Sequence, residues 1–199
     1  MPPSLPTVVE YLSALPAGDA SHPQCMVKAS LVRNALADKP LGAELVLPAA
    51  VRALVDSPPP VSVWIPEVHF NVVMHAIRDG YFGGRRDEFL SWVYTQNRQL
   101  LSTTLYRAVF LVLSPERLLV NMEKRWASLR CGTTLTHERF AAKDLELTVR
   151  TPPHLYSTAV AEGMATAVRA AIDSAGTKSS EVEHHLVSAT EVRFRVRWT

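Results

Sequence analysis

Residues 191–198, Glu-Val-Arg-Phe-Arg-Val-Arg-Trp, alternate strictly between polar and apolar side chains. Successive side chains of a β-strand point to opposite faces, so this pattern predicts a strand with a charged face and an apolar face. Such a strand belongs to a sheet that is buried on one side and solvated on the other. Most of the preceding sequence has helical periodicity, so the chain must build a sheet beside a largely helical half.

The hydrophobic period changes from 3.6 to 2 after Cys131-Gly132. Beyond this point we expect four strands and one helix, in the order β-β-α-β-β. These are the strands 133–140 and 144–150, the helix 155–174, and the strands 181–187 and 191–198. The short turn 141–143 joins the first two strands into a hairpin, and Gly176 follows the helix as glycine commonly does. The sequence therefore predicts one antiparallel sheet layer.

Before Cys131 the apolar residues recur at helical spacing, interrupted by prolines and glycines. Prolines end helices or occupy their first turn, so they set most of the expected boundaries. We expect helices over residues 26–39, 43–55, 66–80 and 87–113, and a further helix that starts at Ser114-Pro115-Glu116. The predicted class is α+β, with a helical N-terminal half followed by a β-β-α-β-β antiparallel sheet layer.

The length of 199 residues suits a single domain. Residues 1–25 are rich in Pro, Ala and Ser, and predict a loose N-terminal arm with one short helix. The remainder, 26–199, is expected to be a single α+β domain. A formal charge of +2 without a dominant basic face argues against a nucleic-acid partner. No targeting signal and no apolar run of membrane-spanning length is seen, so we expect a cytoplasmic protein without membrane contact.

Several short strings carry a resemblance to known families. They are Met26–Leu31, Trp64-Ile65-Pro66, residues 113–117, Met122–Trp126, Ala170–Gly176 and Phe194–Trp198. Together with the element order, they resemble an uncharacterised family found in myxobacteria and, more broadly, the heme-nitric-oxide-binding and vinyl-reductase-type small-molecule-binding fold. The similarity runs from about Met26 to Thr199. Its motifs mark the boundaries of helices and strands and are not catalytic residues, so they indicate a fold more than an activity.

The resemblance implies a domain that encloses a ligand pocket between helices and sheet. Relatives that bind heme carry a Tyr-x-Ser-x-Arg signature, which Tyr156-Ser157-Thr158 does not match. Phenol-sensing relatives hold zinc with cysteines near the final hairpin, and residues 190–193 contain none. We therefore expect no cofactor and no metal.

The candidate ligand-binding residues are aromatic, because ligand pockets combine apolar walls with a few polar tips. They are Trp92, Tyr94, Tyr106, Trp126, Phe140 and Tyr156. The alternative is that these side chains fill an ordinary core. No catalytic motif stands out, since no serine lies in a nucleophile-elbow context and no glycine-rich stretch has phosphate-loop spacing. We therefore expect no catalytic residues and no enzymatic activity.

Histidines and cysteines do not form a metal-binding pattern. His69 and His75 are six residues apart on one expected helix, and His184 and His185 point to opposite faces of a strand. Cys25 and Cys131 show no CxxC spacing, and we expect Cys131 to be a small buried thiol.

The sequence favours a non-enzymatic sensory or regulatory module that binds an apolar, aromatic or lipid molecule and signals to a protein partner. The alternative is an interaction or scaffold protein that acts through a homo-oligomeric interface such as a dimer. Exposed apolar residues on the first helices would favour this alternative.

Overall fold

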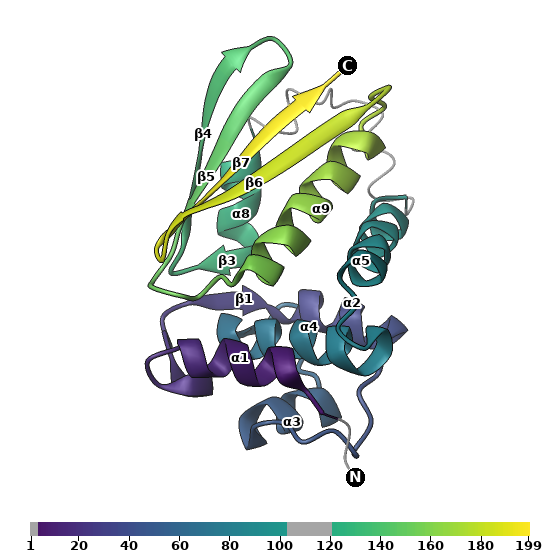
Figure 1. Ribbon diagram of the computed structural model, residues 1–199, viewed down its shortest axis with the longest axis vertical. Helices are drawn as coiled ribbons and strands as arrows, with labels where there is room; N and C mark the ends of the chain where they lie inside the picture. Colours follow the sequence, from purple (N-terminus) through teal and green to yellow (C-terminus); the bar gives the residue numbers. More distant parts are fainter. Residues whose placement is uncertain (1–3, 103–120) are drawn as a thin grey trace. The chain divides into compact units, whose positions relative to one another are not determined.

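The computed structural model describes residues 4–102 and 121–199 of the chain. Figure 1 labels its elements along the sequence, where helices precede the large sheet. The helices are α1 (Pro6–Ala14), η1 (Gly18–Ala20), α2 (Ala29–Asp38), α3 (Ala49–Asp56), α4 (Glu67–Phe82), α5 (Arg86–Leu101), α8 (Met122–Leu129) and α9 (Thr158–Ser174). The strands are β1 (Met26–Lys28), β2 (Trp64–Pro66), β3 (Arg130–Cys131), β4 (Thr134–Ala141), β5 (Asp144–Arg150), β6 (Ser180–Ser188) and β7 (Glu191–Trp198). The predicted α+β class is confirmed.

The chain forms two compact units, and each is described by itself. The helical unit is drawn from residues 1–89, 129–132 and 153–155. The sheet unit is drawn from residues 90–128, 133–152 and 156–199. The expected division into a 1–25 arm and one 26–199 domain stays a prediction.

The sheet unit is built on a four-stranded antiparallel sheet of order β4-β5-β7-β6. Both predicted hairpins are confirmed, with boundaries within one residue of those expected on β5 and β7. Leu147 lies opposite Phe194, and both side chains are buried. The alternation read from residues 191–198 therefore separates a buried face from a solvated one.

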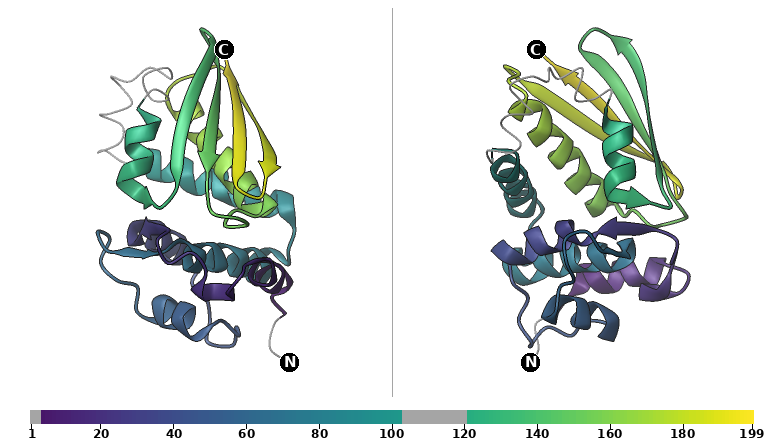
Figure 2. Two further views of the ribbon diagram at one scale, coloured as in Figure 1. Left: turned by 90° about the vertical axis from the view of Figure 1, so that its left-hand side faces the viewer. Right: turned by 180° about the vertical axis from the view of Figure 1, so that it is seen from behind.

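Helix α9 packs against β6 and β7 on the buried face of this sheet, as Figures 1 and 2 show. Ser157 begins the helix, because its side chain accepts a hydrogen bond from the main-chain N–H of Val160 at 3.2 Å. Ala161 and Ala165 are buried on it. Small side chains at these positions let the helix axis approach the sheet.

The helical unit contains a small sheet of order β2-β1-β3 that sequence periodicity did not predict. Two expected helices are too long, each for its own reason. Residues 26–28 pair with β2 and β3, so the helix expected at 26–39 begins at Ala29. The helix expected at 43–55 begins at Ala49, because Pro48 takes the N-cap position and the preceding residues form a turn.

The N-terminal segment contains the expected short helix, α1. Our expectation that this segment is loose is wrong, because Val8 and Tyr11 are 3% and 2% exposed and α1 packs on α4. The apolar stripe of α1 is thus part of the buried core of the helical unit.

The helix expected at 87–113 is present as α5 up to Leu101, and residues 103–113 lie outside the described part. The helix start expected at Ser114-Pro115-Glu116 also lies outside it. Within residues 4–102 and 121–199, no helix combines the length and the apolar character needed to cross a bilayer.

Candidate functional site

Four polar side chains are buried in a row along α4. Glu67, Asn71, His75 and Asp79 are 0%, 1%, 5% and 8% exposed. They are spaced four residues apart, which places them on one face of a helix. We call them the polar column. Burying polar groups costs free energy unless each finds a partner, so the contacts of the column define its role.

Glu67 holds the first turn of α4 to β3. Its Oε1 atom lies 2.9 Å from the Nη1 atom of Arg130, whose side chain is 11% exposed. Its main-chain N–H donates to the carbonyl of Cys25 at 2.9 Å. Removing one partner of such a buried pair leaves a charge without compensation, so this contact is sensitive to substitution.

Asn71 and Tyr11 form a hydrogen-bonded triangle with the carbonyl of Leu155. The Nδ2 atom of Asn71 donates to the Tyr11 hydroxyl at 3.0 Å and to the Leu155 carbonyl at 3.1 Å. The Tyr11 hydroxyl donates to the same carbonyl at 2.9 Å. Burial raises the pKa of Tyr11 well above its ordinary value, so this hydroxyl stays protonated and remains a donor.

The His75 ring stacks on the ring of Tyr11, with centroids 5.0 Å apart and an interplanar angle of 23°. Burial lowers the pKa of His75 to about 4, and the neighbouring charge of Arg78 acts in the same direction. The ring is therefore neutral at physiological pH. A neutral imidazole packs against the tyrosine without the cost of a buried charge.

Asp79 binds the beginning of α1. Its Oδ2 atom accepts hydrogen bonds from the main-chain N–H groups of Thr7 at 2.9 Å and Val8 at 3.4 Å. The first N–H groups of a helix have no partner within the helix, and the helix dipole favours negative charge there. Burial raises the pKa of Asp79, and these hydrogen bonds oppose that shift.

The polar column thus joins α1, α4, Arg130 and Leu155 by directional contacts. Its contacts run to Tyr11 and Arg130 and to main-chain groups of α1 and Leu155, and they do not assemble a nucleophile with a base. Our sequence interpretation missed it. The signal was present in the four-residue spacing Glu-x-x-x-Asn-x-x-x-His-x-x-x-Asp on a helix that is otherwise apolar on that side.

The predicted ligand-binding aromatics lie in the sheet unit, except for Tyr106, which is outside the described residues. Tyr94 on α5 donates to Asp173 Oδ2 at 2.7 Å, near the C-terminal end of α9. Tyr156 is 4% exposed and precedes the first turn of the same helix. A helix rises about 1.5 Å per residue, so roughly 25 Å separates the two ends of α9. These two tyrosines therefore do not share one pocket wall.

The remaining candidates also point to different surroundings. Trp126 on α8 donates from Nε1 to Thr133 Oγ1 at 3.1 Å and is partly buried, as is Trp92 on α5. Phe140 is 49% exposed, with the Arg195 guanidinium 3.8 Å from its ring centroid. The described residues do not bring the six aromatics together, and ligand binding by them stays a prediction.

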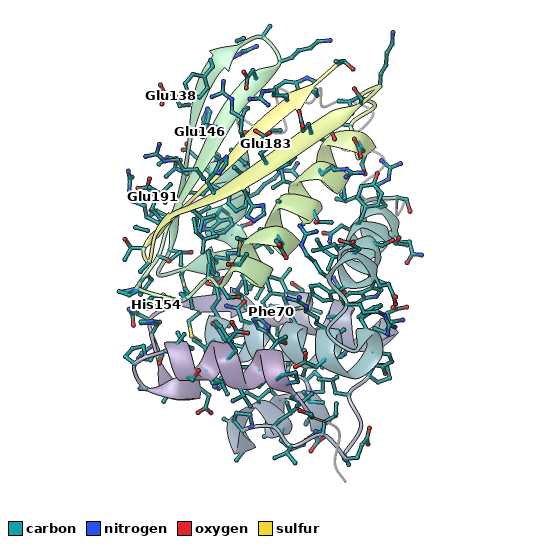
Figure 3. The ribbon with its side chains drawn as sticks, viewed as in Figure 1. Phe70, Glu138, Glu146, His154, Glu183 and Glu191 are labelled. Atoms are coloured by element: carbon teal, nitrogen blue, oxygen red, sulfur yellow. The ribbon has the colours of Figure 1, made fainter. Side chains whose placement is uncertain are left out.

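The solvated face of the large sheet carries alternating charges. Glu138, Glu146 and Glu183, labelled in Figure 3, come from β4, β5 and β6 and lie on this face. Arg195 stands between the last two on β7, and its Nε atom is 2.6 Å from Asp144 Oδ1. Both side chains of this ion pair are only partly exposed, at 23% and 24%, and the pair joins β5 to β7 on this face.

Metal-binding geometry is not found in the described residues, where no group of three or more His, Cys, Asp or Glu side chains could hold an ion. His184 and His185 lie opposite Phe194 and Arg193, so they face opposite sides of the sheet as expected. Both cysteines are free. The expectation of a buried Cys131 is wrong, since Cys131 is exposed on the two-residue strand β3 and Cys25 is the buried one.

The fold is that of heme-nitric-oxide-binding domains, written H-NOX. Fe(II) unliganded H-NOX from K. algicida superposes with a TM-score of 0.53 at 13% identity, covering 86% of this chain and 96% of that one. An oxygen-binding H-NOX domain related to soluble guanylate cyclases gives 0.54 at 9% identity, covering 85% and 92%. A Cs H-NOX with an unnatural amino acid gives 0.56 at 12% identity, covering 86% and 96%.

Residues 94–199 match the protein family of unknown function DUF2378, and the chain belongs to this family. The expected resemblance to an uncharacterised family with the heme-nitric-oxide-binding fold is confirmed. The expected myxobacterial origin stays a prediction. No curated protein matches the sequence.

A heme would need an axial ligand in an apolar enclosure and partners for its propionates. His75 is enclosed, but its ring packs on Tyr11 within the helical unit. His137 is partly exposed, and its Nδ1 atom lies 2.7 Å from Glu123 Oε1. Ser157, in the string nearest to a propionate signature, caps α9. These residues do not fit a heme, and the proposed function does not involve one.

Proposed function

We propose that this protein is a non-enzymatic sensory module that binds a small apolar or aromatic molecule other than heme. The observation that carries the proposal is the H-NOX fold, which spans more than four fifths of the chain. Proteins with this fold include one that binds oxygen. The chain keeps the fold while the surroundings of His75 and His137 do not fit a heme ligand, which favours a different occupant.

The side chains that we propose to test individually for ligand contact are Trp92, Tyr94 and Trp126 of the sheet unit. Each is partly buried, so each combines an apolar ring with accessible surface. Tyr94 and Trp126 also have polar tips fixed by Asp173 and Thr133. Phe140 is less suitable, because its ring lies beside Arg195 on the solvated face.

Native mass spectrometry of freshly purified protein tests the proposal first. A co-purified molecule of defined mass, released on denaturation, supports a binding module and identifies its chemistry. The same sample should show no absorption band of bound heme, and added hemin should not be retained on desalting. Retention of one hemin per chain would contradict the proposed occupant.

Substitutions then locate the site. We expect Trp92→Ala and Trp126→Ala each to lower the affinity for the co-purified molecule, or for the apolar probe anilinonaphthalene sulfonate, by about tenfold or more. A tenfold loss of affinity corresponds to about 1.4 kcal/mol of binding free energy, which is in the range expected from the loss of one aromatic contact. Phe140→Ala is the matched control and should bind normally. Equal affinity in all three variants would refute the assignment.

A sensory module must pass its state to another protein, and we propose a protein partner or a second copy of the chain in that role. This proposal has a specific observation in its favour, namely the exposed apolar residues Leu186 and Val187 on the edge strand β6.

A further inference from the structure

The large sheet has two edge strands, β4 and β6, and they differ in how their edges are protected. An edge strand offers main-chain N–H and C=O groups to any further strand, so proteins usually cover it. On β4, Glu123 from α8 accepts a hydrogen bond from the main-chain N–H of His137 at 3.1 Å. This carboxylate occupies a group that a further strand would need, so β4 is a poor docking edge.

Strand β6 is nine residues long, and its second half is exposed. Leu186 and Val187 are 41% and 51% exposed, which is high for apolar side chains in a sheet. A long edge strand with exposed apolar residues is a surface suited to strand pairing.

The hydrogen-bond register shows which main-chain groups of β6 point outward. The N–H of Thr199 donates to the carbonyl of Ser179 at 3.0 Å, on the β6 side of β7. The N–H of Trp198 donates to the carbonyl of Lys143 at 3.2 Å, on the β5 side. In an antiparallel ladder, alternate residues bond to alternate neighbours. Pairing of β6 with β7 continues without a shift through Leu186. The N–H and C=O groups of Val182 and Leu186 therefore point away from β7, toward the open edge.

We propose that β6 pairs antiparallel with β6 of a second copy of this chain, about a twofold axis at residue 184. The central sequence Val182-Glu183-His184-His185-Leu186 is self-complementary in this register. Val182 lies opposite Leu186 of the second copy, and the outward main-chain groups of these residues bond each other. Glu183 lies opposite His185 of the second copy, at a non-hydrogen-bonded pair where side chains approach most closely.

Charge favours this register over the two registers whose twofold axis lies at residue 183 or residue 185. With the axis at Glu183, the two Glu183 carboxylates would face each other, and like charges directly opposite are destabilising. With the axis at His185, the two His185 rings would meet and Glu183 would lie opposite the apolar Val187. The axis at residue 184 places Glu181 opposite Val187 and brings the two His184 rings together, but of the three registers it is the one in which both Glu183 carboxylates lie opposite His185 imidazoles, which can donate hydrogen bonds to them.

A second copy suits this edge better than an unrelated peptide because the complementarity is internal to the strand. A closed twofold interface also uses the same patch on both chains and leaves no further β6 edge exposed. The two sheets would join into one continuous sheet. This inference concerns the open edge of β6 and does not depend on ligand binding.

The test is sedimentation equilibrium of the full chain over a range of concentrations. We expect a monomer–dimer equilibrium. His185→Glu places two glutamates opposite each other at both pairs and should raise the dimer dissociation constant by about tenfold or more. The exchange variant Glu183→His/His185→Glu restores opposite partners and should recover the dimer. Because the exchange variant keeps the same residue types, recovery also excludes misfolding as the cause of the loss.

Thr136→Glu is the matched control, since it adds a negative charge to the same sheet face at the other edge strand. It should leave the dissociation constant unchanged. A monomer at every concentration up to the solubility limit would overturn the proposal. A dimer that His185→Glu leaves intact, or that Thr136→Glu weakens equally, would overturn it as well.

Discussion

Replacing Glu67 with alanine removes a carboxylate that is fully buried against Arg130. The substitution leaves the guanidinium, itself 11% exposed, in a site built for an ion pair. Breaking a buried pair from one side costs about 3–5 kcal/mol, because the remaining charge loses its partner without regaining water. Arg130 is not completely enclosed, so we expect a loss near the lower end, about 3 kcal/mol.

A double-mutant cycle separates the pair from the general effect of losing a large side chain. Arg130→Met keeps the apolar stem of the arginine and removes its charge. If the ion pair is the cause, Glu67→Gln and Arg130→Met will be far from additive, and the double variant will be more stable than the sum predicts. Glu88→Gln is the control, because Glu88 and Arg85 form a pair that is more than half exposed. That change should leave stability unaltered within error.

The assay is urea unfolding followed by far-ultraviolet circular dichroism, with the free energy of unfolding extrapolated to water. Tryptophan fluorescence reports mainly on the sheet unit, which holds Trp92, Trp126 and Trp198, so its transition will differ from that of circular dichroism if the two units unfold at different urea concentrations. A loss below about 1 kcal/mol for Glu67→Ala, which is the range of exposed ion pairs, would refute the reasoning. So would strict additivity in the cycle.

Three further predictions concern single groups. Burial lowers the pKa of His75 to about 4, so as the pH falls the unfolded chain binds a proton at this residue before the folded chain does. The free energy of unfolding should therefore be full above about pH 6.5 and decline by up to about 3 kcal/mol toward pH 4. In His75→Asn this pH dependence should flatten. Cys131 is exposed, whereas burial raises the pKa of Cys25 to about 11. Iodoacetamide should therefore modify Cys131 rapidly and Cys25 only after unfolding, which mass spectrometry can measure. Ser157→Ala should lower the unfolding free energy by about 1 kcal/mol through loss of the cap on α9, whereas Thr158→Ala should not.

The large sheet could be predicted from the sequence because its strands carry their own signal. Eight alternating residues in β7 determine both the strand and its buried face, and the turn at 142–143 fixes the first hairpin. These features are local, so periodicity and turn residues are sufficient to find them.

The small sheet could not be predicted in the same way. Strands β1, β2 and β3 contain two or three residues each, which is too short for a period to be recognised. They exist because Val27 pairs with both Ile65 and Arg130, residues that are distant in sequence. Pairing of this kind depends on tertiary structure and leaves little trace in local composition.

The aromatic candidates show a different limit of sequence reasoning. The sequence shows which aromatic residues the chain contains, but their convergence is a property of three-dimensional structure. Phe140 illustrates this, because it lies within β4 but on the solvated face beside Arg195, away from the other candidates. A bulge between Arg139 and Ala141 interrupts the pairing at that point, which alternation alone does not reveal.

The polar column explains why α1 and α4 adopt one arrangement and not a neighbouring one. Apolar contacts such as those of Val8 have little directional preference, so α1 could slide along α4 by one turn, about 5.4 Å, at moderate cost. Such a slide would separate Asp79 from the N–H groups of Thr7 and Val8, and Tyr11 from Asn71. Each broken contact would leave a buried polar group without its hydrogen bond, at about 1–3 kcal/mol per group. The column therefore contributes less to the driving force of folding than to the choice of a single packing register for α1.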